Sequence, residues 1–455
     1  MSANLNRRAF LKNTGTTALA GAVASGVPVS IASTNDKTAN TTSKYDLDAI
    51  YNRVGTDCYK WDSQIEKFGR ENLAVPMGVA DMDFKGAPCI TKALARRIEH
   101  ENYGYLDIPD SYNDSIIDWN RTRYGLNVES DWLLNANGVN PAILSALRAF
   151  APPGSKVIVQ PPTYSAFYGT IKRAQCLSDE NPLTLVNGRY EIDFEDLERR
   201  CADPLCKAII LCNPQNPTGN CWSLRDQTTV GEICTNHGVI VLSDEIHCDF
   251  VNRGHRYVPY ASIDDEALVR NSVTFKSTSK SFNLSATKCA YLFSSNPDHI
   301  TQIRETGHNG SVNTLGIVAS QAAYEEGAGW LDEVIAYIDG NMQYAADFIT
   351  SNVPLIDFVK PQGTYLAWLD TSRLQERIGA EESAIEANKT RDPDTPELVA
   401  SQMVGRYLLE NAGVYLNDGI HYGVGGSGCT RMNLATSRKL VELALNNLAS
   451  ALQKA

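Results

Sequence analysis

The stretch 272–291 places a lysine directly behind a run of residues typical of a β-strand. The apolar and β-branched residues 272–275 come first, the chain then turns polar, and Lys280 follows four residues after the polar turn begins. Desolvation and nearby positive charge lower the pKa of a lysine in such a place, and the neutral amine can condense with an aldehyde to form a Schiff base. An isolated lysine in a loop is usually a solvated surface residue. Whether Lys280 has a chemical role therefore depends on which other residues accompany it in the sequence.

Other polar residues also follow strand-like runs directly. Asn216 lies just after one such run, and Asp244 and His247 lie just after the next. Continuous β-branched and apolar runs fit parallel strands buried on both faces, with helices between them. In such sheets, ligands bind outside the carboxyl ends of the strands. The sequence therefore predicts an α/β fold with one shared site. The runs are residues 132–134, 156–160, 208–212, 239–242 and 272–275.

Length, composition and charge narrow the class of protein. A chain of 455 residues with 43% apolar content can bury a large core and is expected to form two domains. The formal charge of -12 argues against a nucleic-acid partner and against an anionic membrane surface. Eleven cysteines are present, without a CxxC pair or metal-ligand spacing. We expect no metal site and no disulfide framework.

Residues 1–33 have the order of a twin-arginine export signal. Arg7 and Arg8 precede Phe10-Leu11-Lys12, and a weakly apolar stretch rich in small residues follows. The apolar stretch is interrupted by glycine and proline and is shorter than the roughly 20 residues of a membrane span. The sequence therefore predicts export of a folded protein by the twin-arginine route to a periplasmic or extracytoplasmic location. No later segment is expected to span a membrane.

Four features now coincide in order along the chain: Asn216-Pro217-Thr218-Gly219, Asp244, Lys280 and Arg431. In this order and spacing the chain resembles the fold-type I pyridoxal-phosphate enzymes, over about residues 45–452. Further motifs resemble those of the cystathionine β-lyase (MalY/PatB-type) branch of the class I/II aminotransferase superfamily. These motifs are Lys60-Trp61-Asp62, Val79-Ala80-Asp81-Met82-Asp83-Phe84, Asp244-Glu245-Ile246-His247 and Ser279-Lys280-Ser281-Phe282-Asn283-Leu284.

The resemblance implies a fold with two domains. The large domain, residues 90–329, would bind the cofactor on a mixed, mostly parallel seven-stranded sheet. A smaller C-terminal α/β domain would comprise residues 330–455. Residues 34–89 would form a linker and an N-terminal arm that packs with the small domain. The charged, proline-containing segment 375–396 is expected to be an exposed insertion.

The same resemblance assigns roles around the ring of pyridoxal 5'-phosphate. Lys280 would carry the cofactor as a Schiff base, and the Asp244 carboxylate would keep the pyridine nitrogen protonated, so that the ring accepts electrons. Asn216 would bind the ring 3-oxygen and Tyr164 would stack on the ring face. His247 would lie near the same edge as Asp244, either in direct contact or behind it.

Phosphate and substrate contacts follow from the resemblance as well. The backbone N–H groups of Gly138, Val139 and Asn140, where a loop becomes a helix, would cradle the phosphate. Arg431 would grip the substrate α-carboxylate as a bidentate pair, beside Val79 and Asn216. The remaining phosphate contacts are assigned to Ser277, to Lys288 (where many relatives carry arginine) and to Tyr105, which would reach the cofactor of a neighbouring subunit in a homodimer.

The implied reaction is β-elimination from cystathionine or a related cysteine S-conjugate, giving pyruvate, ammonia and a thiol. Lys280, once released from the cofactor, would remove the Cα proton. An aminotransferase needs the same residues, so the motifs leave that alternative open, as they do a cofactor-binding scaffold without turnover. Gly78 departs from the branch, which usually has tryptophan there, so the substrate pocket is expected to be wider or differently lined.

Overall fold

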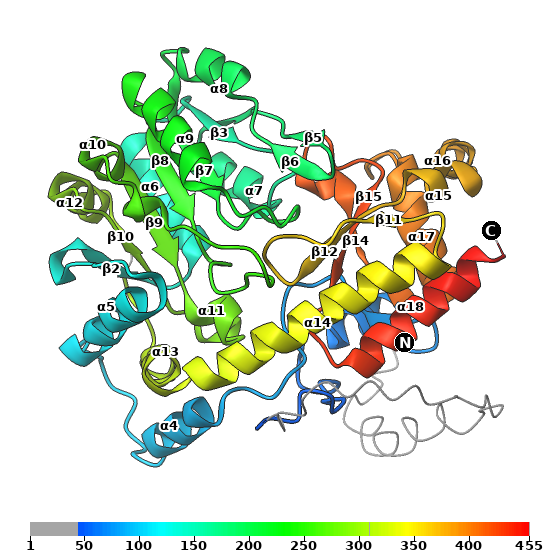
Figure 1. Ribbon diagram of the computed structural model, residues 1–455, viewed down its shortest axis with the longest axis horizontal. Coiled ribbons are helices and arrows are strands. Elements are labelled where there is room, and N and C mark those ends of the chain that lie inside the picture. Colours follow the sequence, from blue (N-terminus) through cyan, green and yellow to red (C-terminus); the bar gives the residue numbers. More distant parts are fainter. Residues whose placement is uncertain (1–43, 309, 455) are drawn as a thin grey trace, which may run out of the picture. The chain divides into compact units, whose positions relative to one another are not determined.

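The computed structural model of the protein describes residues 44–308 and 310–454. Residues Tyr45–Ala455 form one compact unit (Figure 1). The export signal predicted for residues 1–33 lies outside the described residues. The division of the compact unit into domains at residue 330 stays a prediction. Within the described part of the chain, no helix has the length and apolar character needed to cross a membrane.

A seven-stranded sheet forms the centre of the larger part of this unit. All neighbouring strands are parallel except β10, which runs antiparallel to both of its neighbours. The predicted mixed, mostly parallel sheet is therefore confirmed. Its strands, in spatial order, are β2 (Leu133–Ala136), β10 (Ala290–Phe293), β9 (Ser272–Lys276), β8 (Ile240–Asp244), β7 (Cys206–Cys212), β3 (Lys156–Val159) and β4 (Leu177–Glu180).

Alternate residues of the central strands enter two different cores. In β7, Ile210 packs into the core on one face of the sheet and Ile209 into the core on the other. Side chains along a strand alternate in this way, so continuous apolar runs mark strands covered on both faces. Helices α6 (Val139–Phe150), α7 (Ala166–Arg173) and α12 (Pro297–Glu305) cover one face, and α8 (Phe194–Cys201), α9 (Leu224–Asn236) and α10 (Glu266–Arg270) cover the other (Figure 1).

A four-stranded sheet lies in the C-terminal part of the chain, in the order β11 (Asp357–Phe358), β12 (Leu366–Asp370), β15 (Cys429–Asn433) and β14 (Asn417–Asp418). The long helix α14 (Ala328–Asn352) contacts α13 (Thr314–Glu326) at one end and α18 (Arg438–Leu452) further along (Figure 1). One apolar core joins residues of these helices to residues of the N-terminal arm. Helices α4 (Pro88–Ile98), α5 (Asp110–Tyr124) and α17 (Ala400–Ala412) contribute to the same core.

The N-terminal arm carries helix α3 (Asp62–Phe68) and strand β1 (Val75–Pro76). Strand β1 pairs in parallel with β13 (Val414–Tyr415), so the arm joins the C-terminal part of the chain. A further hairpin is formed by β5 (Thr184–Val186) and β6 (Arg189–Glu191). Through this pairing the arm lies beside β13. The segment that follows β1 in the chain lines the cavity described below.

Segment 375–396 differs from the exposed insertion that its composition predicts. Helices α15 (Ser372–Arg377) and α16 (Ala380–Lys389) form there, and the side chains of Ala380 and Ala384 are buried. Helix α16 packs on α17. The prediction of an exposed insertion was therefore wrong for the first half of the segment. The two buried alanines lie within a charged run, and composition alone does not reveal that their side chains face the protein.

Candidate active site

Every residue predicted for the site, except Tyr105, lines one cavity of about 910 Å³. The parallel strands β7, β8 and β9 bring their carboxyl ends to the same edge of the sheet, which explains why segments distant in sequence meet there. The structure therefore brings the predicted residues together, and their roles stay predictions. The residues in question are Val79, Gly138, Val139, Asn140, Tyr164, Asn216, Asp244, His247, Ser277, Lys280, Lys288 and Arg431.

Lys280 lies in the single helical turn α11 (Thr278–Ser281) that follows β9. Its Nζ donates a hydrogen bond to the backbone oxygen of Ala80 at 2.8 Å. Burial and, in the same direction, the nearby Arg431 guanidinium lower the pKa of Lys280 to about 8. The neutral amine, which a nucleophile or a general base requires, is therefore far more populated near physiological pH than in an ordinary lysine, while the cation still predominates.

Asp244 ends strand β8 and is almost fully buried. One carboxylate oxygen accepts a hydrogen bond from the backbone N–H of Ile246 at 3.1 Å. None of the ion pairs among the described residues includes Asp244, and burial raises the pKa of this carboxyl to about 7. A protonated ligand nitrogen facing Asp244 would restore its charge.

His247 lies on the turn after β8, three residues beyond Asp244, and is buried. Burial, and then the positive charges of Lys280 and Arg431, hold its pKa well below the usual range. The imidazole is therefore neutral. Its Nδ1 has no hydrogen-bond partner among the described residues, and its ring lies edge-on to that of Tyr365 at 5.7 Å.

Arg431 lies in the middle of β15 and is 3% exposed. Its guanidinium donates to Asn216 Oδ1 at 3.0 Å and to the backbone oxygen of Gly78 at 2.9 Å. Its Nε has no partner in the part of the chain that the structure describes, and no carboxylate there forms an ion pair with it. A buried arginine with donors left over is suited to bind an anion such as a carboxylate.

The beginning of helix α6 forms another wall of the cavity. Gly138 is its N-cap, and the first backbone N–H groups of a helix lack partners within the helix and favour anions. The helix starts at Val139, and Pro141 is tolerated in its first turn. Ser277 currently donates its hydroxyl hydrogen to Cys289 O at 2.8 Å, so a phosphate contact requires this hydroxyl to rotate. Lys288 is exposed at the cavity edge.

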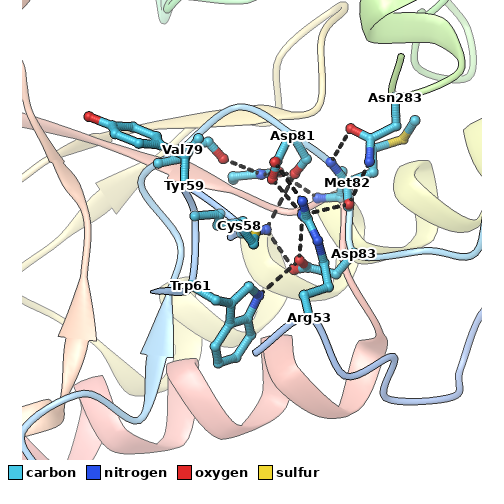
Figure 2. Close-up of polar contacts among 12 residues, drawn as sticks. Arg53, Cys58, Tyr59, Trp61, Val79, Asp81, Met82, Asp83 and Asn283 are labelled. Carbon is cyan, nitrogen blue, oxygen red and sulfur yellow. Dashed lines mark hydrogen bonds and ion pairs between the residues drawn. The ribbon is translucent and has the colours of Figure 1, made fainter. Parts of the chain in front are cut away.

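The segment 78–83 forms the wall beneath Lys280, and its backbone is fixed from several sides. Asn433 Nδ2 donates to the backbone oxygens of Val79 and Asp81, both at 2.6 Å. The Asn283 amide bonds both the N–H and the C=O of Met82 (Figure 2). Because Ala80 O lies within this segment, these bonds fix the acceptor to which Lys280 points.

A partly buried cluster of charges attaches the N-terminal arm to this segment. Arg53 lies between the carboxylates of Asp81 and Asp83, at 2.9 and 3.1 Å, and the indole N–H of Trp61 also reaches Asp83 (Figure 2). Lys60 is 1% exposed and pairs with Asp83 at 2.6 Å. These contacts hold the pKa of Asp83 below its usual range despite its burial, which acts in the opposite direction.

Several residues that line the cavity were missed by reasoning from sequence. Asp81 stands inside a motif that was recognised but received no role. Ser279 directly precedes Lys280, and this position could have predicted that it lines the same cavity. Asn137 lies just before α6 and Ser285 lies after α11. The other four come from the arm and from β13–β14, where no periodicity marks them. The missed residues are Tyr59, Gln64, Asp81, Asn137, Ser279, Ser285, Tyr415 and Asn417.

Tyr105 lies apart from these residues. It does not line the cavity, and its side chain is fully exposed. The structure describes one chain, so the predicted contact with the cofactor of a neighbouring subunit is not tested. That contact stays a prediction.

Comparison with known proteins assigns the chain to a family. The family model described as aminotransferase class I and II matches residues 74–448. The chain belongs to this family. It is 35% identical to the cystathionine β-lyase PatB of Bacillus subtilis (strain 168), over 88% of this chain and 98% of the relative. The protein MalY of Escherichia coli (strain K12) is 30% identical over 90% of this chain and 99% of its own length.

Solved structures of family members are similar as well. Cystalysin from Treponema denticola, which contains a pyridoxal 5'-phosphate cofactor, aligns with a TM-score of 0.80 and 29% identity, over 90% of this chain and 99% of its own. A PLP-bound putative aminotransferase from Clostridium difficile 630 aligns with a TM-score of 0.80 and 34% identity, over 90% and 100% of the two chains. The fold-type I assignment and the resemblance to the PatB and MalY branch are confirmed.

Proposed function

We propose that this protein is a pyridoxal-phosphate-dependent carbon–sulfur β-lyase. It acts on cystathionine or a related cysteine S-conjugate and releases pyruvate, ammonia and a thiol. The observation that carries the proposal is the meeting in one cavity of a lysine with a lowered pKa, a buried carboxylate without an ion-pair partner and a buried arginine without a carboxylate. The lyase activity is favoured over other activities of the family by the similarity to PatB and MalY.

The residues of the cavity suit the cofactor. Burial raises the pKa of Asp244 to about 7, and a pyridine N–H facing this carboxylate would supply the positive charge that stabilises its ionised form. The start of α6 suits a phosphate group. Asn140 Oδ1 and His247 Nδ1 are buried in the cavity wall without partners among the described residues, so polar ligand groups can satisfy them. Asp244, Asn216, Tyr164, Ser277 and Lys280 would hold the cofactor.

In the reaction, the cofactor supplies an electron sink for the negative charge that develops at the substrate Cα. Arg431 binds the α-carboxylate and so orients the Cα–H bond toward Lys280. Lys280 Nζ, in the neutral form that its lowered pKa makes accessible, takes the proton from Cα. Asp244 holds a proton on the ring nitrogen. The thiolate then leaves Cβ, and hydrolysis of the remaining fragment gives pyruvate and ammonia.

The runner-up activity is an aminotransferase, which is supported by the putative aminotransferase of similar structure. Both activities need the same residues. To separate them, the purified, cofactor-loaded full chain is offered L-cystathionine, an S-alkyl cysteine, and an amino acid with a 2-oxo acid. Pyruvate release without a 2-oxo acid supports the lyase, and amino exchange alone supports the transferase. If neither occurs with full cofactor occupancy, the protein is a binding scaffold and the proposal is wrong.

We also propose that the protein works as a homodimer in which Tyr105 contacts the phosphate of the partner's cofactor. The support is the full exposure of the Tyr105 side chain, together with the exposed Tyr103 beside it. Two neighbouring exposed aromatic side chains are typical of an interface. Sedimentation of the full chain at several concentrations tests the dimer, and a monomer at all concentrations contradicts it.

For the location, we propose export by the twin-arginine route. The support is the order of Arg7, Arg8 and the following apolar stretch in the sequence. Cell fractionation of a tagged full chain tests the proposal. Export should be lost when Arg7 and Arg8 are both replaced by lysine, and an unchanged distribution would contradict the proposal.

A further inference from the structure

Two segments that follow neighbouring strands of the central sheet carry the reacting groups of the proposed function. The acid segment, residues 244–249, starts with Asp244 at the end of β8. The lysine segment, residues 276–281, starts at the end of β9 and contains Lys280. Because β8 and β9 pair in parallel, the two segments leave the sheet side by side. Contacts between the segments therefore influence how Asp244 and Lys280 lie relative to each other.

The first contact joins the beginnings of the two segments. Lys276 Nζ lies 3.6 Å from Glu245 Oε2, and the two side chains are 3% and 0% exposed. Glu245 also accepts hydrogen bonds from the Tyr257 hydroxyl and, at 2.8 Å, from the backbone N–H of Tyr260. Lys276 Nζ donates a further bond to Asn120 Oδ1 at 3.1 Å. Loss of either charge would leave the other buried without a partner, so this pair fixes the two segments to each other.

The second contact joins the ends of the two segments. The Ser281 hydroxyl donates a hydrogen bond to Asp249 Oδ2, and both side chains are about as buried as the first pair. The other oxygen of Asp249 accepts from Arg123 Nε at 2.7 Å and from the Tyr124 hydroxyl at 2.5 Å, both in helix α5. Asp249 is therefore held in place from outside the lysine segment. Since Ser281 directly follows Lys280, the bond to Asp249 fixes the backbone next to the lysine.

The lysine segment depends on such contacts because α11 is a single helical turn. A helix of this length is not stable by itself. At its start, the hydroxyls of Thr278 and Ser320 share a hydrogen bond at 2.8 Å. At its end, Ser281 makes the bond just described. Lys280 lies between these two attachments, and its Nζ reaches the backbone oxygen of Ala80 at 2.8 Å. The position of this amine is therefore set by side chains outside the turn.

We propose that Asp249 is a positioning residue, which holds Lys280 in place for proton transfer at the substrate Cα through its hydrogen bond with Ser281. The ion pair at the beginning of the two segments keeps them at a fixed separation, and the bond at their ends orients the turn. Asp249 takes no proton and contributes no atom to the reaction. Proton transfer requires the amine within hydrogen-bond reach of the proton, and a displacement of about 1 Å can lower a rate about 100-fold. This inference rests on the proposed lyase function, because it concerns the amine that acts as its base.

The first test measures the amine of Lys280 in the full chain without cofactor. Acetylation by acetic anhydride, followed by peptide mass spectrometry, should have a midpoint near pH 8 in the unchanged protein. Ser281→Ala should raise the midpoint by about one pH unit, because a released turn lets the amine move toward water, where the cation is favoured. The charged groups near this amine are Arg431, Asp81 and Asp244, and the substitution leaves all three in place. An unchanged midpoint would overturn the proposal.

Kinetics of the cofactor-loaded full chain provide the second test. Ser281→Ala should lower kcat for pyruvate release from a cysteine conjugate about tenfold to 100-fold. KM should stay nearly unchanged, since the substitution does not alter Arg431, which binds the α-carboxylate. This separation of kcat from KM is the result expected of a positioning residue. A kcat that does not change would contradict the proposal.

Ser294→Ala is the matched control for both tests. Ser281 and Ser294 are both 2% exposed. The hydroxyl of Ser294 donates to the backbone oxygen of Ser272 at 2.7 Å, at the opposite end of β9 from the lysine segment. The control should lose a similar amount of stability and keep both kcat and the acetylation midpoint. If the two variants change kcat equally, the role of Ser281 is general stability and the proposal is wrong.

Two conservative variants separate the hydrogen bond from other effects. Asp249→Asn keeps an oxygen that can accept from Ser281, so the midpoint should stay near 8 and kcat should fall less than about threefold. Ser281→Cys keeps a side chain of similar size with a weaker donor, so its effect should lie between those of serine and alanine. This variant takes the place of Ser281→Ala if the alanine variant does not fold. A midpoint that moves with Asp249→Asn but not with Ser281→Ala would show that the charge of Asp249 acts directly, and would overturn the proposal.

Failure of the lyase function can be told apart from failure of this proposal, because the acetylation midpoint requires neither cofactor nor turnover. If the unchanged protein releases no pyruvate, but Ser281→Ala raises the midpoint and Ser294→Ala does not, the positioning role holds and the lyase function is wrong. If pyruvate forms and Ser281→Ala changes neither the midpoint nor kcat, the lyase function stands and the positioning role is overturned.

Discussion

Lys280 and Asp244 lie in the same cavity and have opposite pKa shifts with the same main cause. Burial disfavours the charged form of each, so it lowers the pKa of the amine to about 8 and raises that of the carboxyl to about 7. Without a ligand, each group therefore titrates near neutral pH. At the scale of single residues, the cavity therefore suits a ligand that brings an aldehyde to Lys280 and a proton-bearing nitrogen to Asp244.

The lowered pKa of Lys280 predicts an unusual pH dependence of its reactivity. In the cofactor-free protein, acetylation of Lys280 by acetic anhydride should rise with pH around a midpoint near 8, because the neutral amine reacts and the cation does not. In the unfolded protein the same peptide should react with a midpoint near ~10.4. Peptide mass spectrometry measures both. A midpoint that does not change on unfolding would contradict the shift.

Arg431 makes a prediction about substrate affinity. Arg431→Ala should raise KM for a cysteine conjugate about 10- to 100-fold, the value of charge-assisted hydrogen bonds to a carboxylate. Arg431→Lys keeps the charge but loses the planar pair of donors, so it should recover only part of the loss. Steady-state kinetics on both variants measure the effect. An Arg431→Ala variant with an unchanged KM would show that the α-carboxylate binds elsewhere.

At the scale of elements, the segment 78–83 and the N-terminal arm form one positioning unit for Lys280. The acceptor of the lysine, Ala80 O, also receives the Tyr365 hydroxyl at 3.0 Å. The carboxylates on either side of Met82 are held by Arg53 and Lys60 from the arm. The arm therefore acts on the site through a backbone oxygen and contributes no atom to the reaction at that point.

Breaking the buried Lys60–Asp83 pair should destabilise the protein. Lys60→Met leaves a buried carboxylate with fewer partners, which typically costs about 3–5 kcal/mol. Asp118–Arg121 provides the matched control, since both side chains are more than half exposed and such pairs contribute at most about 1 kcal/mol. The midpoint of thermal unfolding should fall clearly for Lys60→Met and little for Arg121→Ala. Equal falls would contradict this account of the arm.

The strands and the residues that follow them could be predicted from the sequence, because continuous apolar runs end where polar residues begin. Asp244, Lys280 and Asn216 were found in this way. The lining residues Gln64 and Asn417 could not be found, since they are far apart in the chain and the pairing of β1 with β13 and of β14 with β15 brings their segments to one cavity. Long-range pairing has no local pattern. The burial of Lys60, against the usual exposure of lysine, was invisible for the same reason.

At the scale of the whole molecule, exposed aromatic side chains occur both at the cavity and away from it. Tyr59 at the cavity is 68% exposed, and Tyr103 and Tyr105 are exposed elsewhere in the N-terminal half. A partner subunit that covers Tyr105 would join two sites into one assembly, as proposed above. Because Tyr105 would then contact the partner's cofactor, the affinity of each subunit for the cofactor would depend on association of the two chains.

The dimer proposal therefore predicts a link between protein concentration and cofactor retention. Dilution below the dissociation constant of the dimer should release the cofactor, and Tyr105→Phe, which removes the hydroxyl, should raise the cofactor's dissociation constant about fivefold to tenfold, the worth of one hydrogen bond. Tyr103→Phe is the matched control and should have little effect. Equilibrium dialysis measures the affinities. Retention that is independent of concentration and of Tyr105 would contradict the proposal.

The most direct test of the account is the covalent attachment of the cofactor to one lysine. The full chain is loaded with pyridoxal phosphate, reduced with borohydride and digested, and the pyridoxyl group is located by mass spectrometry. The account predicts one pyridoxyl group per chain, on Lys280, and none on the Lys280→Ala variant. A protein that binds the cofactor with no label, or with the label on another lysine such as Lys288, would contradict it.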